Sequence, residues 1–150
     1  MQNALKITKP RIAGIFLLFV VLILVRVFQE QLFYDPFLKF FKETNYAGKP
    51  LPYYNEMQMF IGLLLRYVVN TVISLGIITL FFMDRALVKL SAILYSAFFV
   101  VLTVIFFWLL SLKDVNLLVL FYVRRFLIQP LFLILFIPAF YYQRKTKEIQ

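Results

Sequence analysis

The sequence contains no cysteine and no histidine, and only seven of its 150 residues are acidic. Without cysteine there can be no disulfide, thiolate metal site or cysteine nucleophile. Without histidine the chain lacks the usual general base and metal ligand near neutral pH. Because carboxylates are also scarce, a self-contained hydrolase or metalloenzyme is not expected. We predict that the protein is not an enzyme and has no metal site and no cofactor.

Apolar residues dominate the composition. They make up 63% of the chain, charged residues make up 15%, and the mean hydropathy is +0.89. This composition is typical of integral membrane proteins and is too apolar for a soluble domain. The formal net charge is +9, but most basic residues lie at the ends of apolar runs, where they orient a chain in a membrane. We therefore expect membrane lipid, and no nucleic acid, as a partner.

The apolar runs predict an all-α integral membrane protein with four transmembrane helices, over residues 12–28, 57–83, 86–112 and 116–142. Each of the last three is about 40 Å long as a helix, which is enough for the hydrocarbon core and the interface. The first run is shorter. A basic start before a short apolar run is also typical of a cleaved signal peptide, although no small-residue cleavage site follows it. We expect residues 1–150 to form a single membrane domain.

The distribution of lysine and arginine predicts the orientation. Eight of these residues fall on the side that holds both termini and the turn between the second and third spans, and four fall on the other side. Segments rich in lysine and arginine favour the cytoplasm. We therefore expect a multi-pass protein with both termini in the cytoplasm.

A short amphipathic helix is predicted between the first two spans, over residues 35–43. Asp35 is a typical N-cap residue, and Pro36 is typical of the first helical turn. Phenylalanines recur there at helical spacing, whereas the lysines point elsewhere. One alternative is that the segment lies in the membrane interface, and the other is that its phenylalanines pack on the bundle. These phenylalanines are Phe33, Phe37, Phe40 and Phe41.

Four arginines lie within or at the end of predicted spans, namely Arg26, Arg66, Arg124 and Arg125. Counting helix rise places all of them roughly 21 to 27 Å from the cytoplasmic helix ends, in the outer half of the membrane. A charge inside a span costs roughly 3 kcal/mol and usually faces protein, water or a counter-charge. Guanidinium groups suit planar, bidentate binding of carboxylate or phosphate. These arginines are therefore the first candidates for a functional site.

Two alternatives remain for the arginines. They either bind an anionic ligand or partner, or hold the bundle together by pairing with carboxylates. No predicted span has an acidic residue in its interior, so the available carboxylates lie near the outer face. Arg26 and Glu30 are four residues apart and are predicted to pair on one helix face. The carboxylates near the outer face are Glu30, Asp35, Glu56 and Asp114.

Polar residues accompany the arginines at helical spacing. In the second span, every fourth residue along one helix face is small, polar or charged. Such a face favours close contact between helices and hydrogen bonds from one helix to the next. The residues on this face are Gly62, Arg66, Asn70 and Ser74.

In the last span Arg125 and Gln129 share a face, and Arg124 is rotated from it by about 100°. The two arginines therefore cannot both point at one neighbour, and one of them is free to face a partner or lipid headgroups. Pro130 removes a backbone hydrogen bond and predicts a kink just below them. The predicted site for a partner or an anion consists of Arg26, Arg66, Asn70, Arg124, Arg125 and Gln129.

Three stretches resemble a known family: FYVRRFLIQPLFLILFIPAFYYQ (residues 121–143), RVFQEQLFYDPFLKFF (26–41) and LLLRYVVNTVISL (63–75). The chain is similar over nearly its whole length to the exosortase F system-associated proteins, small multi-span proteins of Bacteroidetes encoded beside exosortase F. The runs RRFLIQP and LFYDPF are the most distinctive. The resemblance implies a bacterial inner-membrane partner of a membrane-embedded peptidase or transpeptidase that sorts proteins by a C-terminal signal. Exosortases use cysteine, arginine and histidine, and this chain lacks two of the three, so the resemblance does not extend to peptidase activity.

From these observations we expect a non-catalytic inner-membrane accessory subunit of an exosortase-type sorting or export system, with an intramembrane arginine layer that docks a membrane protein partner or an anionic group. A second hypothesis is an anionic lipid-binding or transport-complex subunit. A third is a purely structural assembly factor without a ligand.

Overall fold

The computed structural model describes residues 7–43, 48–128 and 131–149, and within these ranges the chain is all-α, as predicted. The predicted spans 57–83 and 86–112 each lie within one residue of a helix in the structure. The helices are α1 (Lys9–Val27), α2 (Gln29–Leu32), α3 (Pro36–Lys42), α4 (Glu56–Phe82), α5 (Arg85–Ser111), α6 (Leu117–Ile128) and α7 (Leu131–Ile149).

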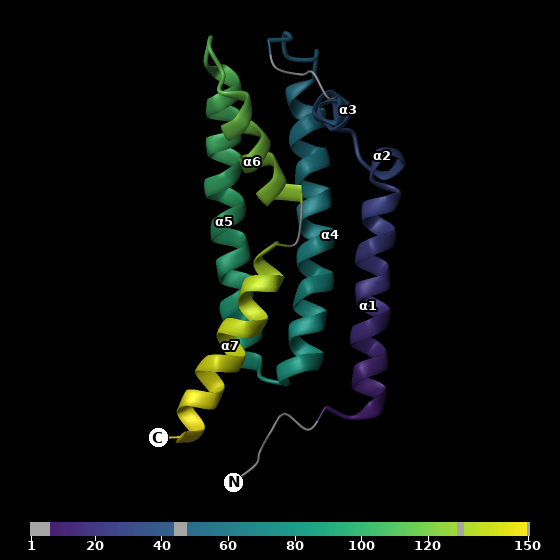
Figure 1. Cartoon of the computed structure of the whole chain (residues 1–150), viewed down its shortest axis with the longest axis vertical. Helices are drawn as coiled ribbons and strands as arrows, with labels where there is room; N and C mark the ends of the chain where they lie inside the picture. The colour runs from purple at the N-terminus through teal and green to yellow at the C-terminus, as the bar shows by residue number, and fades with distance from the viewer. Residues whose placement is uncertain (1–6, 44–47, 129–130, 150) are drawn as a thin grey trace.

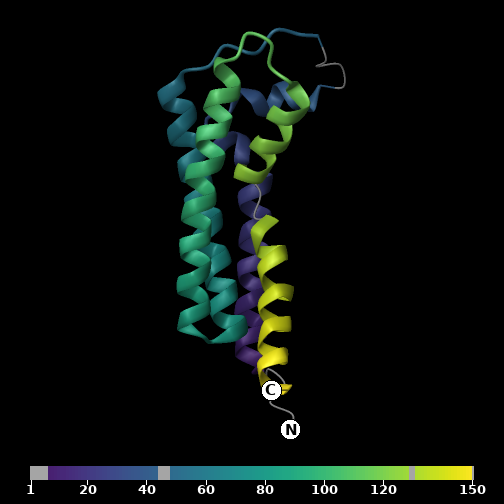
Figure 2. The ribbon, with the colours of Figure 1, turned by 90° about the vertical axis from the view of Figure 1, so that its left-hand side faces the viewer.

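The long helices run up and down beside one another (Figure 1). α1 leads from one end of the bundle to the other, α4 returns, α5 leads back, and α6 followed by α7 returns once more. The start of α1 and the end of α7 therefore lie at the same end (Figure 2). The short helices α2 and α3 lie toward the opposite end, with α3 beside the upper part of α4 in Figure 1. α4 is central and packs against α1, α5 and α6.

Three helices of the described chain, α1, α4 and α5, are long and apolar enough to cross a membrane, and α6 with α7 makes a fourth if the pair is one bent span. This number indicates a multi-pass membrane protein. The predicted fourth span 116–142, for which a kink at Pro130 was expected, corresponds to two helices: α6 ends at Ile128, α7 begins at Leu131, and the two are inclined at 64°. Proline has no N–H to donate, so Pro130 cannot bond the carbonyl four residues earlier. Gln129 and Pro130 themselves lie outside the described residues.

Glycines let α1 and α4 approach closely. A Cβ atom on Gly14 would lie 2.9 Å from Leu80 Cδ1, and one on Gly76 would lie 3.1 Å from Leu18 Cδ1. Small residues at such contacts are typical of helix pairs in membranes, where van der Waals packing drives association. The opposite side of α1 is different, since side chains such as Phe16 are largely exposed there. α1 is thus held to the bundle mainly through α4.

The phenylalanines of α3 pack on the bundle, as the second of the two alternatives predicted. Phe37 is fully buried, and its ring centroid lies 6.1 Å from that of Phe106 in α5. The ring centroids of Phe41 and Phe121 of α6 are 5.3 Å apart. These contacts fix α3 against the bundle. That α3 also lies at the membrane surface stays a prediction.

Candidate functional site: a buried arginine–aspartate cluster and the basic pocket beside it

Asp35, Arg66 and Arg124 form one buried ionic cluster. Asp35 Oδ2 accepts a hydrogen bond from Arg66 Nη1 at 2.9 Å and a second from Arg124 Nη2. The three side chains are only 3–4% exposed. Asp35 does stand at the N-cap position of α3, but its side chain makes no capping hydrogen bond. The predicted positions of Asp35 at the N-cap and Pro36 in the first turn are therefore confirmed. The carboxylate itself binds the two arginines, because hydrogen bonds between two charged groups are stronger than a cap to a neutral amide.

The cluster carries more positive charge than its single carboxylate can balance. Among the described atoms of the cluster, three donors (Arg66 Nε and Nη2 and Arg124 Nε) and one acceptor (Asp35 Oδ1) are buried without a hydrogen-bond partner. Aromatic rings compensate in part, since the Arg66 guanidinium lies 5.0 Å from the ring centroid of Phe33 and that of Arg124 lies 5.9 Å from Phe41. Buried charges are costly unless they are paired and fully hydrogen-bonded. The cluster therefore retains unused N–H donors and an excess positive charge.

The small and polar residues of α4 lie on one buried face, which includes Arg66 of the cluster. The predicted grouping of Gly62, Arg66, Asn70 and Ser74 is confirmed, since all four are buried. Gly62 allows the chain before α3 to pass close to α4, because a Cβ atom there would lie 2.6 Å from the backbone oxygen of Tyr34. That approach brings Asp35, the next residue along the chain, onto the arginines.

Asn70 donates a hydrogen bond to the C-terminal end of α6. Its Nδ2 donates to the carbonyl oxygen of Ile128, the last residue of that helix, at 3.0 Å. The last carbonyls of any helix lack intrahelical partners and need another donor when they are not exposed to water. The Asn70 amide therefore stabilises α6 at the point where the predicted fourth span is interrupted.

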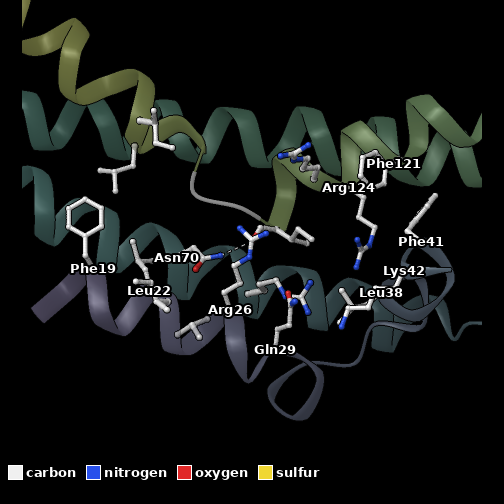
Figure 3. A pocket seen from close by; sticks show the side chains of 17 residues that line it. Phe19, Leu22, Arg26, Gln29, Leu38, Phe41, Lys42, Asn70, Phe121 and Arg124 are labelled. Atoms are coloured by element: carbon white, nitrogen blue, oxygen red, sulfur yellow. Dashed lines mark hydrogen bonds between the residues drawn. The ribbon is translucent and has the colours of Figure 1, made fainter. Parts of the chain in front are cut away.

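A cavity of about 460 Å³ lies beside the cluster, between α1 on one side and α6 and α7 on the other (Figure 3). Arg26 reaches into it from α1 and Arg124 from α6, while Leu38, Phe41 and Lys42 of α3 line one end. No acidic side chain of the described residues lines this cavity, which we call the basic pocket. Its basic side chains are Arg26, Lys42, Arg66, Arg124 and Arg125.

The structure brings together the described members of the predicted site. Arg26, Arg66, Asn70, Arg124 and Arg125 all line the basic pocket, whereas Gln129 lies outside the described residues. The predicted rotation between the two neighbouring arginines places Arg124 in the buried cluster and leaves Arg125 more exposed at the pocket wall.

The predicted pair of Arg26 and Glu30 is wrong. α1 ends at Val27, so the two residues do not belong to one continuous helix. Glu30 instead pairs with Lys42 of α3, and both side chains are about half exposed. The hydrogen bond and the charge of Lys42 hold the pKa of Glu30 below its usual value.

Sequence reasoning missed Lys42 and Gln29 as pocket residues. The sequence pattern placed Lys42 on the polar face of an amphipathic helix. That pattern does not distinguish a side chain that faces solvent from one that lines a pocket. Gln29 begins α2 directly after the break at Phe28, and no local pattern indicated that break.

Basic residues at the opposite end of the bundle have a different role. Arg11 donates to the carbonyl oxygens of Leu80 and Phe81 at 2.8 and 3.0 Å, and Arg144 donates to that of Phe82 at 2.9 Å. These carbonyls end α4, where cations are favourable both as donors and against the helix dipole. Arg11 and Arg144 thus hold the start of α1 and the C-terminal half of α7 against the end of α4.

The site is suited to holding an anion. In the described part of the chain no three acidic side chains come together in a way that would hold a metal ion. The polar groups of the basic pocket are guanidinium, ammonium and amide groups, all of which donate hydrogen bonds. Comparison with known proteins adds no relative: no family model, curated protein or solved structure matches this chain. The resemblance to the exosortase F-associated proteins therefore stays a prediction.

Proposed function

We propose that this protein is a non-catalytic accessory subunit of a bacterial inner-membrane sorting or export system of the exosortase type, and that it docks an anionic group in the basic pocket. The observation that carries the proposal is that basic side chains from α1, α3, α4 and α6 converge on one cavity, which no acidic residue of the described chain lines. Separate elements supply these charges, so the pocket depends on the folded bundle.

The charge balance supports an anionic ligand. Arg26, Lys42, Arg66 and Arg124 bring four positive charges to the pocket, and the carboxylates that pair with members of this set are Asp35 and Glu30. Four positive charges against two carboxylates leave two in excess among these described residues. In a low-dielectric setting such an excess attracts an anion strongly.

The chemistry of the lining supports an accessory role rather than catalysis. An enzyme of the hydrolase type needs a nucleophile and a base with a pKa suited to its task. The guanidinium and amide groups in the pocket bind and orient anions but do not serve as bases near neutral pH. The exosortase-type partner is inferred from the sequence resemblance alone. The orientation with both termini in the cytoplasm is inferred from the distribution of basic residues.

The test is a pull-down of the tagged protein from native membranes, with mass spectrometry of the bound proteins. The variant is Arg26→Gln/Arg125→Gln, since these two residues line the pocket but do not bond to Asp35. The matched control is Lys113→Gln, which removes an exposed charge from the turn between α5 and α6, outside the pocket.

We expect the double variant to lose one specific membrane protein that the wild type and the control both retain. The same set of bound proteins in all three samples would refute docking through the pocket. The alternative function, an anionic lipid-binding or transport-complex subunit, is favoured by the apolar side chains that line the rest of the pocket.

A further inference from the structure

The basic pocket is amphipathic along its length. Arg26 lies near its basic end, and on the same side of α1 the pocket continues past Leu22 to Phe19, about 10 Å further along the helix. The facing wall comes from Leu133 and Ile134 of α7. A ligand that fills the whole pocket therefore needs a charged head and an apolar tail.

The apolar end of the pocket opens to the surroundings of the bundle. Ile23 and Ile134, which line it from α1 and α7, are 60% and 67% exposed. In a membrane-spanning helix such side chains face lipid, because a protein surface inside the bilayer is covered by acyl chains. A lipid can therefore enter sideways between α1 and α7, with its chain remaining in the hydrocarbon region.

In the described part of the cluster, unpartnered buried donors outnumber the one unpartnered acceptor, Asp35 Oδ1. Arg66 Nε and Nη2 and Arg124 Nε are unpartnered and buried, although Asp35 already supplies a carboxylate to both residues. Arg26 and Lys42 approach from other helices. A carboxylate offers two oxygens in one plane, whereas a phosphate offers oxygens in several directions and up to two charges, which matches donors that converge from different sides.

Building on the anion-docking function above, we propose that the pocket binds the phosphate headgroup of an anionic membrane lipid, with one acyl chain along the apolar wall of α1 and α7. The phosphate takes the unused donors of the two cluster arginines and the charge of Arg26. The lipid thereby completes the ionic cluster that Asp35 balances only in part.

The test uses the full-length protein in phosphatidylcholine nanodiscs and measures binding by native mass spectrometry. Four probes separate the two halves of the ligand. Lysophosphatidate has a phosphate and a chain, inorganic phosphate has no chain, a fatty acid of equal chain length has a carboxylate head, and lysophosphatidylcholine has a zwitterionic head. We expect lysophosphatidate to bind at least about tenfold more tightly than each of the other three.

Two variants probe the two halves of the pocket. Arg26→Gln/Arg125→Gln should weaken lysophosphatidate at least about tenfold, with Lys113→Gln as its control. Ile23→Trp fills the apolar end of the pocket and should weaken the binding of lysophosphatidate by a similar factor. Val104→Trp is the control for Ile23→Trp, because Val104 is a 64% exposed residue of α5 outside the pocket.

Each other outcome overturns a defined part of the reasoning. If inorganic phosphate binds as tightly as lysophosphatidate, or if lysophosphatidate binds Ile23→Trp as tightly as the wild type, the acyl chain does not occupy the pocket. Equal or tighter binding of the fatty acid would replace phosphate by carboxylate and leave the anion-docking function intact. If no anionic probe binds the wild type while the pull-down still loses its partner in the arginine variant, the lipid is refuted and partner docking stands. If neither assay responds, both proposals fall.

Discussion

Replacing Asp35 by asparagine should destabilise the protein more than any other single polar substitution of similar volume. The change keeps the shape of the side chain but removes the carboxylate that Arg66 and Arg124 share at 3–4% exposure. Two buried guanidinium groups then face each other without a counter-charge. Breaking a buried ion pair by removing one partner costs about 3–5 kcal/mol. A loss of about 3 kcal/mol lowers the ratio of folded to unfolded protein more than about a hundredfold.

The assay is reversible denaturant unfolding in detergent micelles, followed by circular dichroism. Lys42→Gln is the matched control, because it breaks the Glu30 pair, whose side chains are 58% and 44% exposed. Exposed pairs contribute little to stability because solvent screens them, so this control should unfold close to the wild type. A double-mutant cycle with Arg124→Gln completes the experiment. Removing one of the two unpaired arginines relieves their repulsion, so the double variant should be more stable than Asp35→Asn alone.

Two results would refute this reasoning. A loss below about 1 kcal/mol for Asp35→Asn would mean that the pair behaves as an exposed salt bridge. Strict additivity in the cycle would mean that Asp35 and Arg124 do not interact in the folded protein, contrary to their hydrogen bond.

Three further predictions test the surroundings of the cluster. Asn70→Leu leaves the last carbonyl of α6 without its donor and should lower the unfolding free energy by about 1–3 kcal/mol, whereas an unchanged value would mean that water replaces the amide. Gly62→Ala forces the backbone at Tyr34 away from α4 and should cost about 1–3 kcal/mol; a neutral result in thermal unfolding would place that segment elsewhere. The folded-state pKa of Glu30 is lowered, chiefly by the hydrogen bond from Lys42, so the stability from this pair is present above the usual carboxyl pKa and is lost as the pH falls through the lowered value. Glu30→Gln should therefore reduce the acid-side slope of stability against pH, and an identical slope in both proteins would contradict the pairing.

Local patterns in the sequence were enough for the helices that span the bundle. The apolar runs and their bounding turns predicted α4 and α5 to within one residue at each end, because run length and turn chemistry are properties of neighbouring residues. The predicted continuous fourth span was less successful. Pro130 indicated a disturbance there, but the 64° inclination between α6 and α7 depends on what the ends of these helices contact, and Asn70 of α4 provides one of those contacts.

The sequence by itself determined that arginines lie at similar depth on three helices and that few carboxylates are available to answer them. Only the tertiary structure decided which carboxylate pairs with which arginine. Asp35 is 31 residues from Arg66 and 89 from Arg124, and it reaches both because aromatic packing holds α3 against the bundle and Gly62 lets the preceding chain approach α4. An ion pair needs its atoms within a few ångströms, and that proximity arises when distant helices pack, so spacing along the chain does not encode it.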